Sequence, residues 1–265
     1  MKATKFLTVV FICLAARSSQ AMVRGSEVVE EFHQSYALSD GGSVRLNNIN
    51  GGVEIKVWDK REVEVDAEKR ADDKDMMEQL QIVVNASQDL VDIDTKYPDD
   101  NNTHNDHGPW VEYTITVPRD ANLDRIKIIN GDIEISGVGG KMNASTINGI
   151  VRASDVKNDC ILETVNGTID ADFASLKSRC DLRIKSVNGS IAVNLPADLN
   201  ARIKAKTVSG HISNDFGIVL SRDSDDHSFV KIGDSIDGKI GNGDGYVNAE
   251  TVNGSIKILK SGEGK

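Results

Sequence analysis

Apolar and polar residues alternate along much of the second half of the chain with a period of two. For example, Leu162, Thr164 and Asn166 occupy alternate positions and would lie on one face of a strand. The intervening Glu163 and Val165 would lie on the opposite face. This period is typical of β-strands with one buried face, because successive side chains of a strand point to opposite sides. The pattern predicts an all-β chain of short strands.

Asn-Gly turns interrupt these strands at regular intervals. The pair is favoured where the backbone must adopt a positive φ, since glycine has no Cβ. The glycines of the clear copies are separated by 18, 18, 22, 21 and 44 residues, and 44 is twice 22. Residues 237–240 are a candidate degenerate copy within the longest interval. The turn glycines are Gly131, Gly149, Gly167, Gly189, Gly210 and Gly254, with an earlier copy at Gly51.

This spacing predicts the fold class. A coil of 18–22 residues cannot bury its own apolar face, so coils must stack and hydrogen-bond to one another. We therefore expect a parallel β-solenoid, which is β-helix-like, over residues 119–260, followed by a short tail at 261–265.

Stacking would place equivalent residues of successive coils in columns. If the threonines and asparagines before each turn point inward, their hydroxyl and amide groups can hydrogen-bond along the stack. Ser209 replaces asparagine in one copy. We expect a structural ladder, and not a ligand site, at Asn130, Asn148, Asn166, Asn188 and Asn253.

The β-branched residue before each asparagine would then face outward and form an apolar ridge. Contiguous exposed apolar surface usually marks an interface. Alternatively, the strand bends before the turn and buries these side chains, or another segment of the chain covers them. The candidate partner ridge consists of Ile129, Ile147, Val165, Val187, Val208 and Val252.

Residues 22–118 have a different pattern, with less regular spacing. A helix is expected at 73–80, where acidic residues occupy the first turn and interact favourably with the helix dipole. Because the end strands of a solenoid must be protected from pairing with other molecules, we expect this β-rich section to cap the stack. Strands are expected at 44–46, 53–58, 63–67, 82–85, 90–94 and 111–117.

Residues 1–21 have the features of a signal peptide. Lys2 and Lys5 precede an apolar run at 6–16, and a small-x-small motif ends at Ala21. The run is too short to span a bilayer. Cleavage would give an exported protein, periplasmic or at the cell surface, that is not an integral membrane protein. An uncleaved anchor and a lipid anchor on Cys13 are alternatives, although Ile12 stands where a lipid-attachment motif needs a small residue.

Two cysteines remain after such cleavage, Cys160 and Cys180. Their spacing of 20 residues is nearly one coil, and in an oxidising compartment adjacent coils are close enough for a disulfide. However, they lie seven and nine residues before their turn glycines, so their registers differ by two. The sequence leaves both a disulfide and two free thiols open.

The sequence contains few candidate residues for catalysis or for binding a cofactor. His104 and His107, in a polar loop rich in aspartate, are candidate metal ligands. Acidic residues after the turns, such as Glu134 and Asp170, form no pair at a repeated spacing of the kind that glycoside cleavage needs. A net charge of −10 argues against nucleic-acid binding. We expect no enzymatic activity and no cofactor.

Several motifs together resemble a known family. They are Val-Asn-Gly-x-Ile repeated through residues 129–256, Asn-Gly-Gly-Val-Glu-Ile at 50–55 followed by Trp58-Asp59, and Thr-Val-Pro at 116–118. With the export signal, they resemble the bacterial putative-adhesin family, which is related to the head GIN domain of autotransporter-like adhesins. The resemblance covers about residues 40–260. It implies an exported, right-handed β-solenoid and supplies no catalytic residues.

These observations favour a non-catalytic, adhesin-like binding or structural module of the cell envelope, whose partner is an envelope protein or a glycan. The alternatives are a carbohydrate-active β-helix protein that binds or cleaves polysaccharide, and a signalling or scaffold subunit of the envelope.

Overall fold

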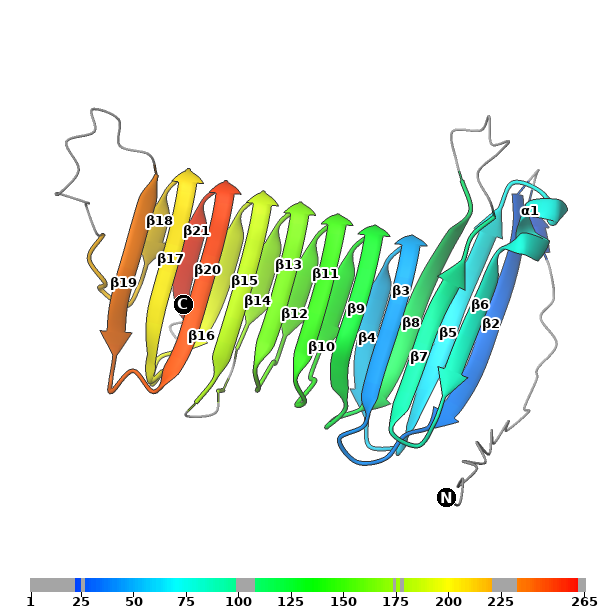
Figure 1. The fold of residues 1–265 in the computed structure, drawn as a ribbon, viewed down its shortest axis with the longest axis horizontal. Coiled ribbons are helices and arrows are strands. Elements are labelled where there is room, and N and C mark those ends of the chain that lie inside the picture. The colour runs from blue at the N-terminus through cyan, green and yellow to red at the C-terminus, as the bar shows by residue number, and fades with distance from the viewer. Residues whose placement is uncertain are drawn as a thin grey trace, which may run out of the picture.

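The chain folds into two large mixed β-sheets that lie face to face (Figure 1). The computed structural model describes residues 22–24, 27–98, 108–173, 175–176, 179–220 and 233–261. Sheet A has 11 strands in the order β1-β2-β5-β8-β4-β10-β12-β14-β16-β21-β18, and sheet B has 10 in the order β19-β17-β20-β15-β13-β11-β9-β3-β7-β6. The expected all-β class is therefore confirmed.

The elements before residue 119 match the expected strands and helix closely. The N-terminal strands β1 and β2 were not expected. The elements are β1 (Met22–Arg24), β2 (Glu27–Ala37), β3 (Ser43–Asn50), β4 (Val53–Trp58), β5 (Glu62–Ala71), α1 (Lys74–Gln79), β6 (Gln81–Ala86), β7 (Leu90–Lys96) and β8 (Trp110–Pro118).

Helix α1 begins and ends for local reasons. The Asp73 side chain accepts a hydrogen bond from the Met76 backbone N–H at 2.7 Å, which satisfies a free donor of the first turn. Leu80 is extended and ends the helix. Met77 and Leu80 are buried, so α1 is held against the sheets by its apolar side.

From residue 122 onward, the turn at each repeated glycine joins a strand of sheet B to the next strand of the chain, which lies in sheet A. Neighbouring strand pairs run parallel, and the residue before each turn glycine pairs with its counterpart, as Asn148 does with Asn166. The elements are β9 (Asn122–Asn130), β10 (Ile133–Ser136), β11 (Met142–Asn148), β12 (Val151–Ser154), β13 (Cys160–Asn166), β14 (Ile169–Asp172), β15 (Asp181–Asn188), β16 (Ile191–Pro196), β17 (Ala201–Ser209), β18 (Ile212–Asn214), β19 (Asp234–Ile240), β20 (Gly245–Asn253) and β21 (Ile256–Ser261).

The order of the strand pairs in space differs from their order in the chain at the C-terminal end. The last pair, β20–β21, lies between β15–β16 and β17–β18 (Figure 1). Residues 237–240 are not a degenerate coil, as their sequence suggested, but belong to β19, which pairs antiparallel with β17 at the edge of sheet B. The 44-residue interval between Gly210 and Gly254 thus holds β18, the edge strand β19 and the inserted strand β20.

The apolar core runs without interruption through both halves of the chain. A single cluster of buried residues extends from Val28 to Ile258. β3 pairs with β9 and β4 pairs with β10, so the first Asn-Gly copy stacks directly on the second. The N-terminal section thereby extends both sheets through β8, β5 and β2 on one side and β7 and β6 on the other.

Candidate functional site

The turn glycines are required by the close approach of neighbouring turns. A Cβ on Gly167 would collide with the carbonyl oxygen of Gly149, and a Cβ on Gly149 would collide with that of Gly131. The same holds at each later turn. A positive φ, the reason inferred from the sequence, is not the common cause, because Gly149, Gly167 and Gly254 are not among the residues with positive φ. Glycine is needed here for space.

A buried hydroxyl column lies beside these glycines. The Thr164 hydroxyl donates to the carbonyl oxygen of Gly149 at 3.1 Å, and the Ser186 hydroxyl donates to that of Gly167 at 3.1 Å. Thr146, Thr207 and Thr251 repeat the contact at 2.8–2.9 Å. These side chains are buried, so the hydrogen bonds satisfy polar groups that water cannot reach.

The asparagines form a continuous side-chain ladder. From Asn130 onward, each amide Nδ2 donates to the Oδ1 of the preceding asparagine in the stack at 2.7–2.9 Å. The ladder runs along an exposed edge, whereas the sequence suggested that it points inward. The cause is a local break in the alternation of buried and exposed residues. Thr146 and Asn148 pair with Thr164 and Asn166 of the next strand, whereas Ile147 between them is unpaired. As a result, the two consecutive residues Ile147 and Asn148 both face solvent. The members in spatial order are Asn50, Asn130, Asn148, Asn166, Asn188 and Asn253.

The apolar ridge is exposed on the outer side of sheet B. Val165, Val187 and Val252 have 39%, 41% and 42% of their surface exposed, and Ile147 and Val208 are similar. Ile129 is half-buried, and Ile49 continues the ridge by one strand beyond the predicted set. Among the described residues, no segment of the chain covers these side chains.

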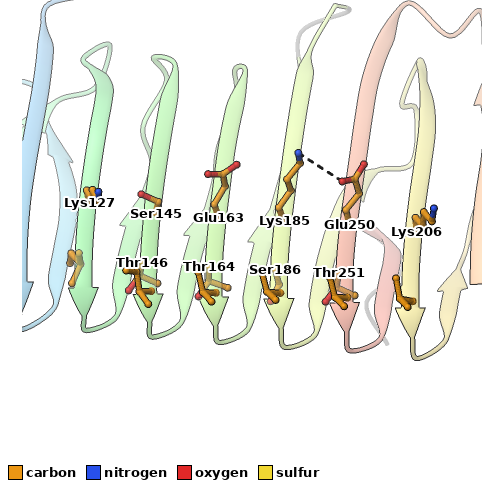
Figure 2. A pocket seen from close by; sticks show the side chains of 16 residues that line it. Lys127, Ser145, Thr146, Glu163, Thr164, Lys185, Ser186, Lys206, Glu250 and Thr251 are labelled. Carbon is orange, nitrogen blue, oxygen red and sulfur yellow. Dashed lines mark ion pairs between the residues drawn. The ribbon is translucent and has the colours of Figure 1, made fainter. Parts of the chain in front are cut away.

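A shallow groove of about 660 Å³ lies along this ridge and is the candidate functional site. Next to the ridge, a row of polar side chains crosses six neighbouring strands of sheet B, with one side chain from each of the six (Figure 2). We call it the charge row. In spatial order it consists of Lys127, Ser145, Glu163, Lys185, Glu250 and Lys206. The sequence did not reveal it, because its order in space depends on the insertion of β20.

The charge row is only loosely neutralised within the molecule. Lys185 and Glu250 form an ion pair at 3.8 Å, close to the limit for such a contact (Figure 2). No ion pair within the described part of the chain involves Glu163, Lys206 or Lys127. The groove therefore offers charges of both signs beside an apolar strip.

A second, more polar pocket of about 430 Å³ lies at the N-terminal end of the asparagine ladder. Its lining includes Trp110, Arg70, Glu27, Asn50 and Asn130. The Trp110 indole N–H donates to Glu112 at 2.7 Å, and this contact fixes the orientation of the ring.

Cys160 and Cys180 are both buried, free thiols, so the disulfide left open by the sequence is not formed in this structure. Cys160 pairs with Leu182, which places Cys180 two positions out of register, as their spacing from the turn glycines predicts. Burial raises the pKa of both thiols, and the charge of Cys180 adds to the effect at Cys160. Thiolate nucleophiles are thereby disfavoured.

Two predicted features lie outside the described residues, namely the signal segment 1–21 and the metal candidates His104 and His107. Within the part of the chain that the structure describes, no group of three or more His, Cys, Asp or Glu side chains is arranged to hold a metal ion. Glu134 and Asp170 are exposed on the outer side of sheet A. No helix in the described ranges has the length and hydrophobicity needed to cross a membrane.

No family model matches the chain, and no curated protein does. Solved structures are similar to it. A putative cell adhesion protein from Clostridium sporogenes has a TM-score of 0.52 and 13% identity, with 87% of this chain and 100% of that chain covered. A putative adhesin from Bacteroides fragilis has a TM-score of 0.33 and 9% identity over 86% and 96% of the two chains.

A putative lipid-binding protein from Parabacteroides distasonis has a TM-score of 0.32 and 15% identity over 87% of this chain and 96% of that chain. At such low identities the similarity is evidence for the fold alone. The comparison with the Clostridium protein supports the fold, because its TM-score is above 0.5. The chain thus has the fold of this putative cell adhesion protein.

Proposed function

We propose that this chain is an exported, non-catalytic, adhesin-like module of the cell envelope, and that the groove on the outer side of sheet B is its binding face. The observation that carries the proposal is the exposed ridge. Five of its six predicted members are exposed, on consecutive strand pairs. A monomeric protein rarely exposes contiguous apolar surface without an interaction to cover it.

The groove has the composition of a protein interface. Its apolar strip would be buried at the centre of a contact, and the Lys and Glu side chains beside it would lie at a polar rim. The strip is also rigid over four of its strands, because the ridge residue there lies between a buried, hydrogen-bonded hydroxyl and a ladder asparagine. These four ridge residues are Ile147, Val165, Val187 and Val252. A rigid surface loses little conformational entropy on binding.

The strand pairs β9–β10 through β20–β21 would wind as a right-handed solenoid, with residues 22–118 as its N-terminal cap. Their parallel registers and the alternation between the two sheets support this winding. Export rests on residues 1–21, which have a basic start, an apolar core and a small-x-small end.

The proposal is tested by capture of a partner from an envelope extract with the mature chain, residues 22–265. The wild type is compared with a Val165→Thr, Val187→Thr variant and with Val219→Thr, a control at the most exposed apolar side chain outside the ridge. We expect one envelope protein, identified by mass spectrometry, to be retained by the wild type and the control and lost by the double variant. Equal retention by all three would refute the proposed face.

The second pocket supports a second candidate, glycan binding. An exposed tryptophan ring with amide, guanidinium and carboxylate groups around it suits a sugar, which offers apolar C–H faces and hydroxyl groups. Titration with envelope oligosaccharides should perturb the Trp110 fluorescence of the wild type. Loss of the response in Trp110→Phe, with Trp58 unchanged, would favour this candidate over a protein partner.

A further inference from the structure

The signs of the charge row follow a regular order at its C-terminal end. On β13, β15, β20 and β17, the row reads Glu163, Lys185, Glu250 and Lys206. Charges therefore alternate from strand to strand. Alternation of this kind has a special property: reading the row backwards exchanges every sign.

A two-fold axis makes use of this property. If a second molecule is rotated by half a turn about an axis that lies along the strands between β15 and β20, its row runs in the opposite direction. Glu163 then faces Lys206 of the second copy, and Lys185 faces Glu250 of the second copy, with the reverse contacts generated by symmetry. This axis keeps the position along the strands, so the ridge of one copy lies on the ridge of the other.

We propose that the partner of the groove face is a second copy of this chain, bound through such a two-fold sheet-on-sheet contact. The inference rests on the proposed function, because it names the occupant of the same face. A contact of this type is isologous, which is the commonest symmetry among soluble homo-oligomers. Val165 packs near Val208 of the second copy, and Val187 near Val252.

Other positions of the axis are less favourable. An axis on β15 would place Lys185 against itself and Glu163 against Glu250, and an axis on β20 would place Glu250 against itself. Like charges facing each other at an interface cost free energy and exclude the wrong arrangement. The axis between β15 and β20 is the one that pairs every charge of the quartet.

The remaining outward residues of the four strands permit this arrangement. In the row beyond the charge row, Ile161 faces Lys204 of the second copy, and Arg183 faces Asn248. No like charges meet there. Stacked sheets lie about 10 Å apart with their strands inclined by about 30°, and this geometry accommodates the twist of both sheets.

The test is the association state of the mature chain, residues 22–265, by analytical ultracentrifugation over a range of concentrations. We expect a reversible dimer. Glu163→Lys creates two Lys–Lys contacts across the axis, and Lys206→Glu creates two Glu–Glu contacts. Each variant alone should dimerise at least about tenfold more weakly.

Mixing these two variants should restore dimers, because the lysine introduced in one variant then faces the glutamate introduced in the other. The double variant Glu163→Lys, Lys206→Glu should also regain the wild-type affinity by itself. Glu134→Lys, the same substitution on an exposed position of sheet A, is the matched control and should change nothing. Equal melting temperatures would show that each variant is folded.

A wild type that stays monomeric up to about 1 mM would overturn the inference. A dimer that Glu163→Lys leaves intact would also overturn it, and so would single variants that fail to form dimers when mixed.

Failure of the dimer inference is distinguishable from failure of the proposed function. A monomeric protein that still captures an envelope protein through Val165 and Val187 would keep the groove as a binding face for a different partner. Absence of both self-association and ridge-dependent capture would remove the proposed function as well.

Discussion

At the scale of single residues, the structure assigns a different cause to the most repeated feature of the sequence. Asn-Gly is a strong turn signal, and its glycine is usually explained by backbone conformation. Here the turns stack so closely that the carbonyl oxygen of one glycine occupies the place of the next glycine's side chain. That contact joins residues at least 18 positions apart, so local sequence reasoning could not have found it.

Substitution of Gly167 by alanine separates the two explanations. Because its Cβ meets the rigid backbone of Gly149, we expect a loss of stability at the upper end of the range for overpacking, about 1–3 kcal/mol. Gly217 is the control: its φ is +70° and its side-chain position is open, so alanine there should cost about 1 kcal/mol through conformation alone. Urea denaturation measures both. A smaller loss at Gly167 than at Gly217 would restore the conformational explanation.

The base of the asparagine ladder makes a pH-dependent contribution through Tyr97. Its hydroxyl donates to Asn48 at 2.7 Å, and burial raises the pKa of Tyr97 to about 12. The folded state therefore keeps a proton that the unfolded chain releases near pH 10. The associated stability is complete below pH 10 and is lost between pH 10 and pH 12, by about 1–3 kcal/mol.

Chemical denaturation across this range should show a smaller alkaline loss in Tyr97→Phe than in the wild type. The variant should be less stable at pH 7, because it lacks the hydroxyl hydrogen bonds. An alkaline decline of the same size in both proteins would assign the effect to other groups, such as Tyr36, whose pKa burial also raises to about 12.

At the scale of elements, the sequence predicts the strands better than their order. Period-two alternation and the Asn-Gly turns locate β9 through β18 and β20–β21, and the outward position of Val165 and Val187 follows from the same alternation. The order at the C-terminal end could not be predicted, since the spacing of 44 residues is compatible with two successive coils. Pairing of β20 with both β15 and β17 is set by long-range contacts that leave no periodic signal.

Truncation after residue 243 tests this order. In the structure, removal of β20–β21 separates β17–β18 from the rest of both sheets, whereas removal of a terminal coil would leave β17–β18 paired. We expect backbone amides of β17 to lose their protection from hydrogen exchange while those of β13 keep theirs. Exchange followed by mass spectrometry on residues 22–243 and 22–265 makes the comparison. Retained protection of β17 would favour sequential stacking.

At the scale of the whole molecule, the N-terminal section completes the stack and does not stand apart from it. The core cluster includes residues on both sides of residue 118, and β3 and β4 pair in parallel with β9 and β10. The terminal strands differ in kind: sheet A ends in β1 and β18, which have three residues each, and sheet B ends in strands paired antiparallel with their neighbours. Short edge strands limit pairing with other molecules.

This arrangement predicts the behaviour of the repeats without the N-terminal section. A chain of residues 119–265 would expose the edges of β9 and β10, two adjacent strands with free backbone donors and acceptors in parallel register. Since such edges are templates for strand addition, we expect this fragment to form large assemblies, whereas residues 22–265 should go no further than a dimer. Light scattering after gel filtration measures the assembly size of both chains.

The Glu163→Lys substitution distinguishes the two kinds of association, because it should weaken the dimer of the longer chain and leave the edge-driven assembly of the fragment unchanged. A fragment that remained a folded monomer would show that the strands before residue 119 are dispensable as a cap.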